Sequence, residues 1–191
     1  MLTLSAVHYK NREYDLAFEY LDQAISLSQL DSKGYTIKGL CLMEQGQNEL
    51  ALKAFSKAWF LDKNAFSLFF IGHCFENLGK NEKAVEFYER ALDEGLRTPD
   101  LLFRFCHILL ELGKGKLAQK KLNKIIADKG VDLNLSFTAA WLSMNLKENK
   151  KALEFLSAMM GLEPVPGPFY SLLAQIYENL GKNDKIETTL K

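Results

Sequence analysis

Two pairs of adjacent histidine and cysteine residues are the side chains in this sequence best suited to metal chemistry. His73–Cys74 and Cys106–His107 set imidazole and thiol groups side by side, and these groups bind zinc. Neighbouring residues on a helix diverge by about 100°, so the members of each pair point to different sides. Structural zinc normally takes four ligands. We therefore expect no metal site, and we expect Cys74 and Cys106 to fill small core positions.

A lysine-rich stretch raises the question of an anion site. The run KGKLAQKKLNK spans residues 114–124, and GKGK at 113–116 lies at its start. The phosphate-loop pattern GxxxxGK[ST] is not present, and neither are GxSxG, HExxH or a dinucleotide fingerprint. We interpret the lysines as the solvated outer face of a helix, with a site for an anionic ligand as the alternative. The sequence predicts no catalytic residue, no cofactor and no enzyme activity.

The composition limits the classes of partner and the compartment. Among 191 residues, 24 Lys and Arg balance 24 Asp and Glu, whereas binding to nucleic acid or to a membrane surface needs a positive excess. The longest apolar stretches, AFSLFFIG and LLFRFCHILL, are shorter than a membrane span, and the first residues lack a secretion signal. Three cysteines without a CxxC pair suit a reducing compartment. We predict a soluble, cytoplasmic protein that binds no nucleic acid and does not insert into membranes.

The chain repeats one pattern with a nearly constant period. The stretch NLGKNEKA at 77–84 returns as NLGKNDKI at 179–186, a shift of three times 34 in the numbering. Anchor positions recur with spacings of 34, 33, 34, 34 and 34, at Ala17, Ala51, Ala84, Ala118, Ala152 and Ile186. Four residues after each anchor stands a large apolar residue, at Leu21, Phe55, Tyr88, Leu122, Leu156 and Leu190. Twelve residues before each stands a small one, at Ser5, Gly39, Gly72, Cys106, Ala140 and Ala174.

Each repeat predicts two helices joined by a short turn. Apolar residues at 68, 71, 72 and 75 follow the spacing of a helix stripe, and Gly79 ends this helix because glycine tolerates a left-handed cap. A second helix begins near Asn81, with residues 84, 87, 88 and 91 on one side. One such hairpin cannot bury its apolar faces alone, but a stack of hairpins can. The sequence therefore predicts an all-α protein.

This template resembles the tetratricopeptide repeat family, whose repeating unit has the same period and carries a small residue in its first helix and Ala-x-x-x-aromatic-x-x-Ala in its second. The resemblance covers essentially the whole chain. It implies a right-handed α-solenoid of about six helix–turn–helix units with the last one truncated. We expect one domain over 1–191, with units at about 1–31, 32–64, 65–98, 99–132, 133–166 and 167–191.

The sequence departs from the family pattern at several positions. Arg12 and Lys147 stand where the turn glycine is expected, Pro164 is the one unit-ending proline, and Ile186 replaces the last anchor alanine. The last unit stops at Lys191, short of a full second helix, and no polar capping helix follows. The chain can therefore be a fragment of a longer protein, or its open C-terminal edge can be covered by a partner or by self-association.

The resemblance places the first helices along a concave groove, and these helices carry more apolar residues than the core stripe needs. Columns with the period of the repeat run through Phe69, Phe103 and Phe137 and through His73, His107 and Trp141. The alternative is that these rings pack between neighbouring first helices. Four large rings exceed the apolar patch that a monomer usually exposes, so we expect a groove site. The candidate groove residues are Thr36, Leu40, Met43, Phe69, His73, Phe103, Arg104, His107, Phe137, Trp141 and Met144.

The expected partner is a protein or peptide with apolar or aromatic anchors. Chaperone-binding members of the family grip a carboxylate with Lys, Asn and Arg, but the corresponding positions here hold Leu2, Ala6, Ile37, Phe66 and Phe70. We predict a non-enzymatic interaction module or scaffold. The alternatives are a chaperone or assembly factor for secreted or membrane-associated clients, and the regulatory part of a larger enzyme. Nucleic-acid reading by a related helical-repeat family is a weaker option, because that family has a slightly longer period and a basic surface.

Overall fold

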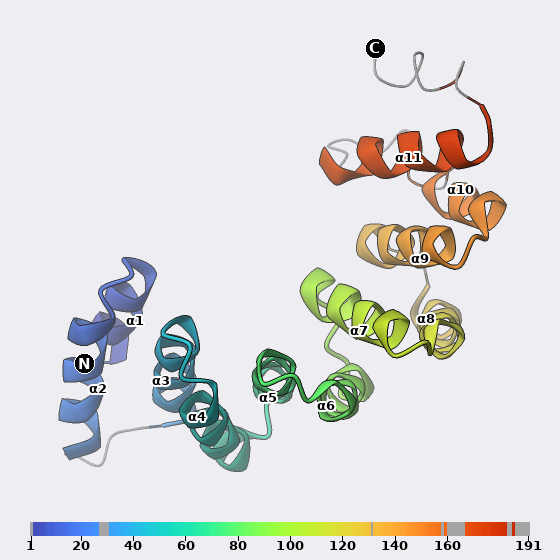
Figure 1. Cartoon of the computed structure of the whole chain (residues 1–191). Coiled ribbons are helices and arrows are strands. Elements are labelled where there is room, and N and C mark those ends of the chain that lie inside the picture. Colours follow the sequence, from blue (N-terminus) through green and yellow to red (C-terminus); the bar gives the residue numbers. More distant parts are fainter. Residues whose placement is uncertain are drawn as a thin grey trace. The chain divides into compact units, whose positions relative to one another are not determined.

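The fold consists of α-helices throughout the part of the chain that the structure describes. This computed structural model describes residues 2–26, 31–130, 132–157, 159, 167–182 and 185, and within these ranges there are eleven helices and no strand (Figure 1). The helices are α1 (Leu2–Lys10), α2 (Tyr14–Ser26), α3 (Ser32–Glu44), α4 (Asn48–Asp62), α5 (Ala65–Asn77), α6 (Asn81–Asp93), α7 (Pro99–Glu111), α8 (Gly115–Lys129), α9 (Leu133–Asn145), α10 (Asn149–Ser157) and α11 (Gly167–Asn179). The prediction of an all-α fold is confirmed.

Consecutive helices pack in pairs, α1 with α2, α3 with α4, α5 with α6, α7 with α8 and α9 with α10. The chain divides into two compact units, Met1–Arg97 and Thr98–Lys191, which we call the N-terminal unit and the C-terminal unit. The expectation of one domain with six hairpins stays a prediction. The second helix of the last hairpin, with Ile186 and Leu190, lies outside the described residues, as do Pro164 and the open C-terminal edge.

Four of the first helices begin at a side-chain cap. The oxygens of Asp31, Asn64, Thr98 and Asp132 accept hydrogen bonds from backbone N–H groups in the first turn of α3, α5, α7 and α9. Such caps satisfy donors that a helix start would otherwise leave unpaired. Among the described residues, no helix is long and apolar enough to cross a bilayer.

The turn inside each hairpin requires a left-handed residue, and not every hairpin supplies a glycine there. Gly79 has φ +69°, and Lys147 at the equivalent position has φ +63°. Both turns have the same hydrogen bonds: the Gly79 N–H donates to the Glu76 carbonyl and the Lys147 N–H to the Met144 carbonyl. The turn geometry therefore persists without glycine, and the side chain at Lys147 adds backbone strain.

We expect Lys147→Gly to raise the free energy of unfolding by about 0.5–1 kcal/mol, because glycine adopts this φ without a Cβ penalty. Chemical denaturation of the purified protein measures the change. Lys147→Ala is the control, since it removes the charge and keeps the Cβ. Equal stability of the glycine and alanine variants would contradict the strain argument.

The small positions of the template lie against the large apolar residues of the partner helix. A Cβ atom on Gly39 would lie 2.6 Å from Phe55 Cε1, and one on Gly72 would lie 2.5 Å from Tyr88 Cδ1. Both rings are fully buried. The five anchor alanines are also fully buried, at Ala17, Ala51, Ala84, Ala118 and Ala152. The core positions that the repeat predicts are thus confirmed for these residues.

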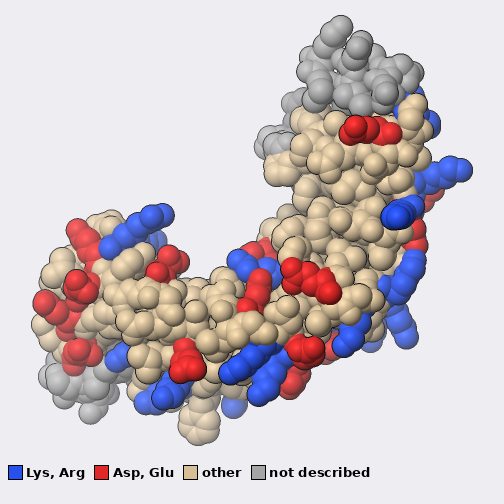
Figure 2. Space-filling model, in the orientation of Figure 1, with Lys and Arg blue, Asp and Glu red and all other residues tan. Residues whose placement is uncertain are grey.

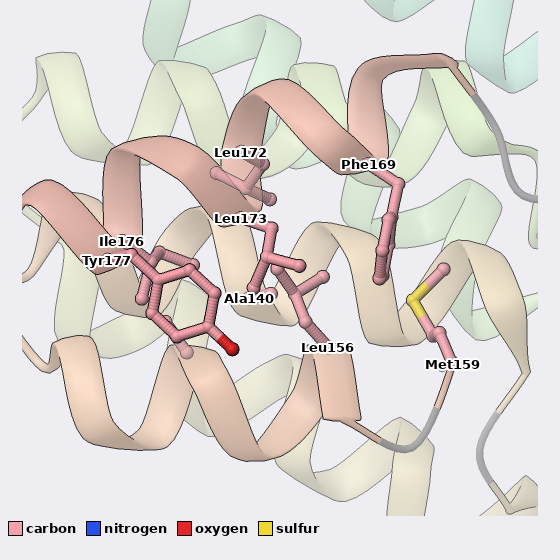
Figure 3. Close-up of a cluster of buried hydrophobic side chains, with 9 residues drawn as sticks. Ala140, Leu156, Met159, Phe169, Leu172, Leu173, Ile176 and Tyr177 are labelled. Atoms are coloured by element: carbon pink, nitrogen blue, oxygen red, sulfur yellow. The ribbon is translucent and has the colours of Figure 1, made fainter. Parts of the chain in front are cut away.

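In the C-terminal unit, the small position of the template holds a larger residue than glycine, and the apolar residue that faces it is smaller than an aromatic ring. Figure 3 shows Ala140 of α9 beside Leu156 of α10, with Leu173 of α11 packed onto the same cluster. Phe169 and Met159 belong to this cluster as well. The template position therefore changes from glycine against an aromatic ring to alanine against leucine, which conserves the filled volume.

Candidate functional site

Three rings from α7 and α9 form an aromatic cluster on the surface of the C-terminal unit. The centroid of Phe103 lies 4.6 Å from that of Trp141 and 5.8 Å from that of His107, and the centroids of His107 and Trp141 are 6.2 Å apart. Phe103 is 39% exposed, and the other two rings are half-buried. We call Phe103, His107 and Trp141 the aromatic cluster. The sequence placed all three in the groove, and the structure brings them together.

A pocket of about 330 Å³ borders this cluster. It lies among α7, α9 and the start of α11, and Phe103 belongs to both features. The lining residues are Pro99, Asp100, Phe103, Leu133, Asn134, Phe137, Thr138 and Pro168. The pocket thus combines two phenylalanine rings and other apolar groups with a few polar side chains, which is the usual composition of a ligand site.

Polar side chains beside the pocket are paired along α7. Arg104 Nε donates a hydrogen bond to Asp100 Oδ1 at 2.9 Å, and His107 Nδ1 lies 3.8 Å from Glu111 Oε1. Asp100 is the one charged residue that lines the pocket within the described part of the chain. Asp100 is thus paired with Arg104, which does not itself line the pocket.

The remaining candidates on α9 are partly buried. Phe137 lines the pocket, and Phe137, Trp141 and Met144 all pack against the cluster of buried residues from α9, α10 and α11. Their inner edges therefore belong to the core, and their outer edges contribute to the surface. Met144 is not among the residues that line the pocket.

The candidates in the N-terminal unit are more deeply packed. Phe69 is 6% exposed, and its ring centroid lies 5.1 Å from that of Phe70 and 5.9 Å from that of Tyr88. Leu40 and Met43 are partly buried against the hydrophobic cluster of α4 and α5. A ring as covered as Phe69 offers a ligand little area, so we do not count it among the anchors. His73 is half-buried, with its ring centroid 6.2 Å from that of Phe69.

Thr36 lines a smaller hollow of about 260 Å³ between α3 and α5. Ile37 and the 47% exposed Phe66 line it too. The Thr36 hydroxyl donates to the Ser32 carbonyl at 2.8 Å, so one of its hydrogen bonds is used within α3. This hollow occupies the same place between two first helices as the pocket between α7 and α9, but it has more polar walls.

The cysteines are buried thiols without metal-site geometry. Burial raises the pKa of Cys41 to about 11 and that of Cys74 and of Cys106 to about 12, so thiolate is scarce at neutral pH. No group of three or more His, Cys, Asp or Glu side chains suited to a metal ion occurs among the residues that the structure describes. Cys74 and Cys106 fill core positions, as the sequence predicted.

We expect the three thiols to react with an aqueous disulfide reagent only after unfolding, with full reaction in denaturant as the control. The folded-state pKa values lie above the ordinary value of 9.0, so the folded state holds these protons more tightly. The contribution to stability is complete below pH 9.0 and is lost as the pH rises toward 12. Rapid reaction of the native protein at neutral pH would contradict this burial.

The lysine-rich stretch lies on α8, and Lys116 is bound to the neighbouring hairpin. Lys116 Nζ and Gln119 Nε2 both donate to the Glu148 carboxylate in the turn between α9 and α10. These two hydrogen bonds lower the pKa of Glu148, and the one from Lys116 has the larger effect. Lys120 and Lys124 are exposed, in agreement with the solvated face that the sequence predicted.

Six of the residues that line the pocket are not among the candidates predicted from the sequence. These are Pro99, Asp100, Leu133, Asn134, Thr138 and Pro168. The repeat period could have identified some of them. Asp100, Asn134 and Pro168 occupy the same position in successive repeats, as Phe103 and Phe137 do. Residues at equivalent positions in the first turns of α7, α9 and α11 therefore lie on the same surface as the aromatic residues.

Comparisons with known proteins place this arrangement among helical repeats. A family model described as tetratricopeptide repeat matches residues 37–164. A TPR repeat-containing protein of Methanocaldococcus jannaschii is 28% identical over 93% of this chain. The chain spans about a third of the length of that curated relative, 33%.

Solved structures share the fold at low identity. PilF of Pseudomonas aeruginosa is 15% identical with a TM-score of 0.71, covering 98% of this chain and 86% of that one. A tetratricopeptide repeat protein from Parabacteroides merdae is 19% identical with a TM-score of 0.72, covering 97% and 74%. YrrB, described as a TPR protein with an unusual peptide-binding site, is 22% identical with a TM-score of 0.59, covering 89% and 88%.

Proposed function

The chain belongs to the tetratricopeptide repeat family, and on that premise we propose that it is a non-enzymatic module that binds an apolar or aromatic segment of a partner protein. The family fold supports protein–protein interaction. The proposed site is the surface that α7, α9 and α11 form in the C-terminal unit. The observation that carries the proposal is the apolar pocket of about 330 Å³ beside the exposed aromatic cluster.

The size and lining of the pocket support a side-chain anchor as its occupant. Its volume is at the lower end of the range of about 300–1,000 Å³ for ligand sites, which suits one or two apolar side chains. Phe103, Leu133 and Phe137 supply apolar walls. Asn134 and Thr138 supply polar groups that can pair with the backbone of a bound segment. Burying a large apolar side chain there contributes about 1.5–3 kcal/mol before association costs.

Binding of an acidic C-terminal tail is disfavoured by the side chains present. Ile37 and Phe66 occupy two of the positions at which chaperone-binding relatives have carboxylate-gripping residues, and both line the hollow between α3 and α5. Asp100, the charged residue of the larger pocket, carries a negative charge and is paired with Arg104. An apolar segment suits these surfaces better than a carboxylate does.

A second candidate function is the interaction part of a larger protein, including an enzyme. One observation favours it, namely that the chain spans 33% of the length of the curated relative. In that case the site proposed above would bind a partner or regulate a neighbouring catalytic domain.

The test is selection of peptides from a phage-displayed random library on the immobilised protein, followed by hydrogen exchange with the selected peptides bound. We expect enrichment of peptides with aromatic or large aliphatic residues and slower exchange in α7 and α9. Enriched peptides that leave exchange in α7 and α9 unchanged would reject the proposed site. Many unrelated binders in a native lysate would indicate a chaperone instead of a dedicated scaffold.

A further inference from the structure

We infer that the outer face of α3 and α4 is a second binding surface, which takes an acidic peptide segment that carries apolar side chains. We call this surface the α3–α4 face and define it by Tyr35, Leu50, Lys53, Lys57, Phe60 and Leu61. It lies wholly within the N-terminal unit. It shares no residue with the pocket of the C-terminal unit, so the inference does not depend on the function proposed above.

The end of α4 exposes an unusual amount of apolar area. Phe60 is 77% exposed and Leu61 is 54% exposed. The Lys63 ammonium lies 5.5 Å from the centroid of the Phe60 ring. Single exposed apolar residues are ordinary, but here two adjacent ones border a hollow together with Tyr35.

Two hollows adjoin on this face. The first, of about 350 Å³, is lined by Phe60 and Leu61 together with Tyr35 and Lys57. The second, of about 380 Å³, shares Tyr35 and Lys57 with the first and extends along α4 as far as Leu50. The hollows share the walls Tyr35 and Lys57, so they form a track of two neighbouring hollows that can receive successive side chains of one segment.

The charged residues that line the two hollows are all lysines. Lys38, Lys53 and Lys57 line the hollows, and no Asp or Glu of the described residues does. Lys38 Nζ lies 3.8 Å from Asp22 of α2, whereas Lys53 and Lys57 form no ion pair with any residue in the described part of the chain. The Lys57 ammonium lies 5.3 Å from the centroid of the Tyr35 ring. Figure 2 shows blue atoms of Lys and Arg, and some red atoms of Asp and Glu, beside tan atoms where α4 lies in Figure 1.

The nearby carboxylate of Asp62 faces another surface. Asp62 accepts a hydrogen bond from the Ser32 hydroxyl at 3.4 Å and lines the hollow between α3 and α5. It therefore does not neutralise the lysines of the α3–α4 face. Apolar hollows with cations at their rims are complementary to a segment with apolar side chains flanked by Asp or Glu.

The fold itself does not require this composition. By the repeat register, Phe60 of α4 corresponds to Asp93 of α6 and to Ala127 of α8. A polar residue is thus accepted at this position in a neighbouring hairpin. Because the equivalent positions in α6 and α8 have no aromatic ring, the stacking of hairpins does not need one at Phe60. This favours a role of the ring in binding.

A peptide suits the face better than a membrane does. Two separate hollows of this size match discrete side chains of a peptide. One protruding ring also gives weak membrane attachment unless many basic residues support it, and the whole chain carries no net positive charge.

The test uses the same phage-displayed random library with two double variants. In Lys57→Glu with Phe60→Ser, both changes lie on the α3–α4 face. The matched control is Leu117→Ala with Lys124→Glu on α8, because Lys124 has the repeat position of Lys57 and Leu117 is also exposed. All four side chains lie on the exposed faces of their helices, so both variants are expected to fold, and circular dichroism checks this.

We expect one class of selected peptides to be acidic and to contain Phe, Trp or Leu. Their affinity should fall about tenfold or more in Lys57→Glu with Phe60→Ser, fall with added salt, and stay unchanged in the α8 control. The inference is overturned if no acidic class is selected, or if its affinity survives these changes. It is also overturned if phosphatidylserine vesicles bind through Phe60 while no acidic peptide does. Phe103→Ala should not affect this class, which separates the result from that for the proposed groove site.

Discussion

Gly72→Ala is expected to lower the free energy of unfolding by about 1–3 kcal/mol, although alanine is the better helix former by about 1 kcal/mol. The added Cβ would lie 2.5 Å from Tyr88 Cδ1 and 3.3 Å from the Ala84 carbonyl oxygen. The Tyr88 ring cannot move aside easily. It is fully buried, stacks on Phe69, and its hydroxyl donates a hydrogen bond to Glu76.

A double-mutant cycle with Tyr88→Leu tests whether the clash with the Tyr88 ring causes the loss of stability in Gly72→Ala. An alanine at position 72 facing a leucine at position 88 would reproduce the combination that Ala140 and Leu156 make in the C-terminal unit. We expect the double variant Gly72→Ala with Tyr88→Leu to be more stable than the sum of the single changes predicts, by about 1 kcal/mol or more. Urea denaturation of the four proteins measures this coupling.

Gly115→Ala provides the control for a glycine whose neighbours can adapt. Its Cβ would meet Leu110 Cδ2 and Leu146 Cδ2, both at 2.8 Å, and these are the ends of flexible side chains. We expect a change smaller than that for Gly72→Ala. Additive effects in the cycle of Gly72 and Tyr88 would show that the small position is not set by the ring that faces it.

Phe103→Ala is expected to weaken binding of the selected apolar peptides by about tenfold to a hundredfold. The ring lines the pocket and packs on Trp141, and it remains exposed enough for a ligand to cover it. Loss of one large apolar contact costs about 1.5–3 kcal/mol, and each step of about 1.4 kcal/mol is tenfold in affinity. Fluorescence anisotropy with labelled peptides measures the change.

Two further variants make this result specific. Phe103→Tyr keeps the ring and should keep most of the affinity, whereas Phe60→Ala removes an exposed ring from the N-terminal unit and should leave apolar peptides unaffected. Circular dichroism melting shows whether each variant stays folded. Unchanged affinity in a folded Phe103→Ala protein would remove the aromatic cluster from the proposed site.

The repeat, the helices and the core positions could be predicted from the sequence, because they depend on local spacing. Ala84 and Tyr88 face the preceding helix of their hairpin wherever the repeat period holds, and both are fully buried. The turn could be located in the same way. That Lys147 adopts the glycine conformation follows from the hydrogen bonds and packing on both sides of the turn, which outweigh the preference of one residue.

Only the tertiary structure decided which aromatic rings are available to a ligand. Phe69 and Phe103 share one column of the repeat, yet Phe69 is buried and Phe103 is exposed. The difference comes from their neighbours, because the Phe70 and Tyr88 rings cover Phe69, while Phe103 packs on Trp141 and keeps one side open to the pocket. A repeat determines where each backbone position lies, but the exposure of a side chain depends on the sizes of residues from adjacent helices, which differ from one hairpin to the next.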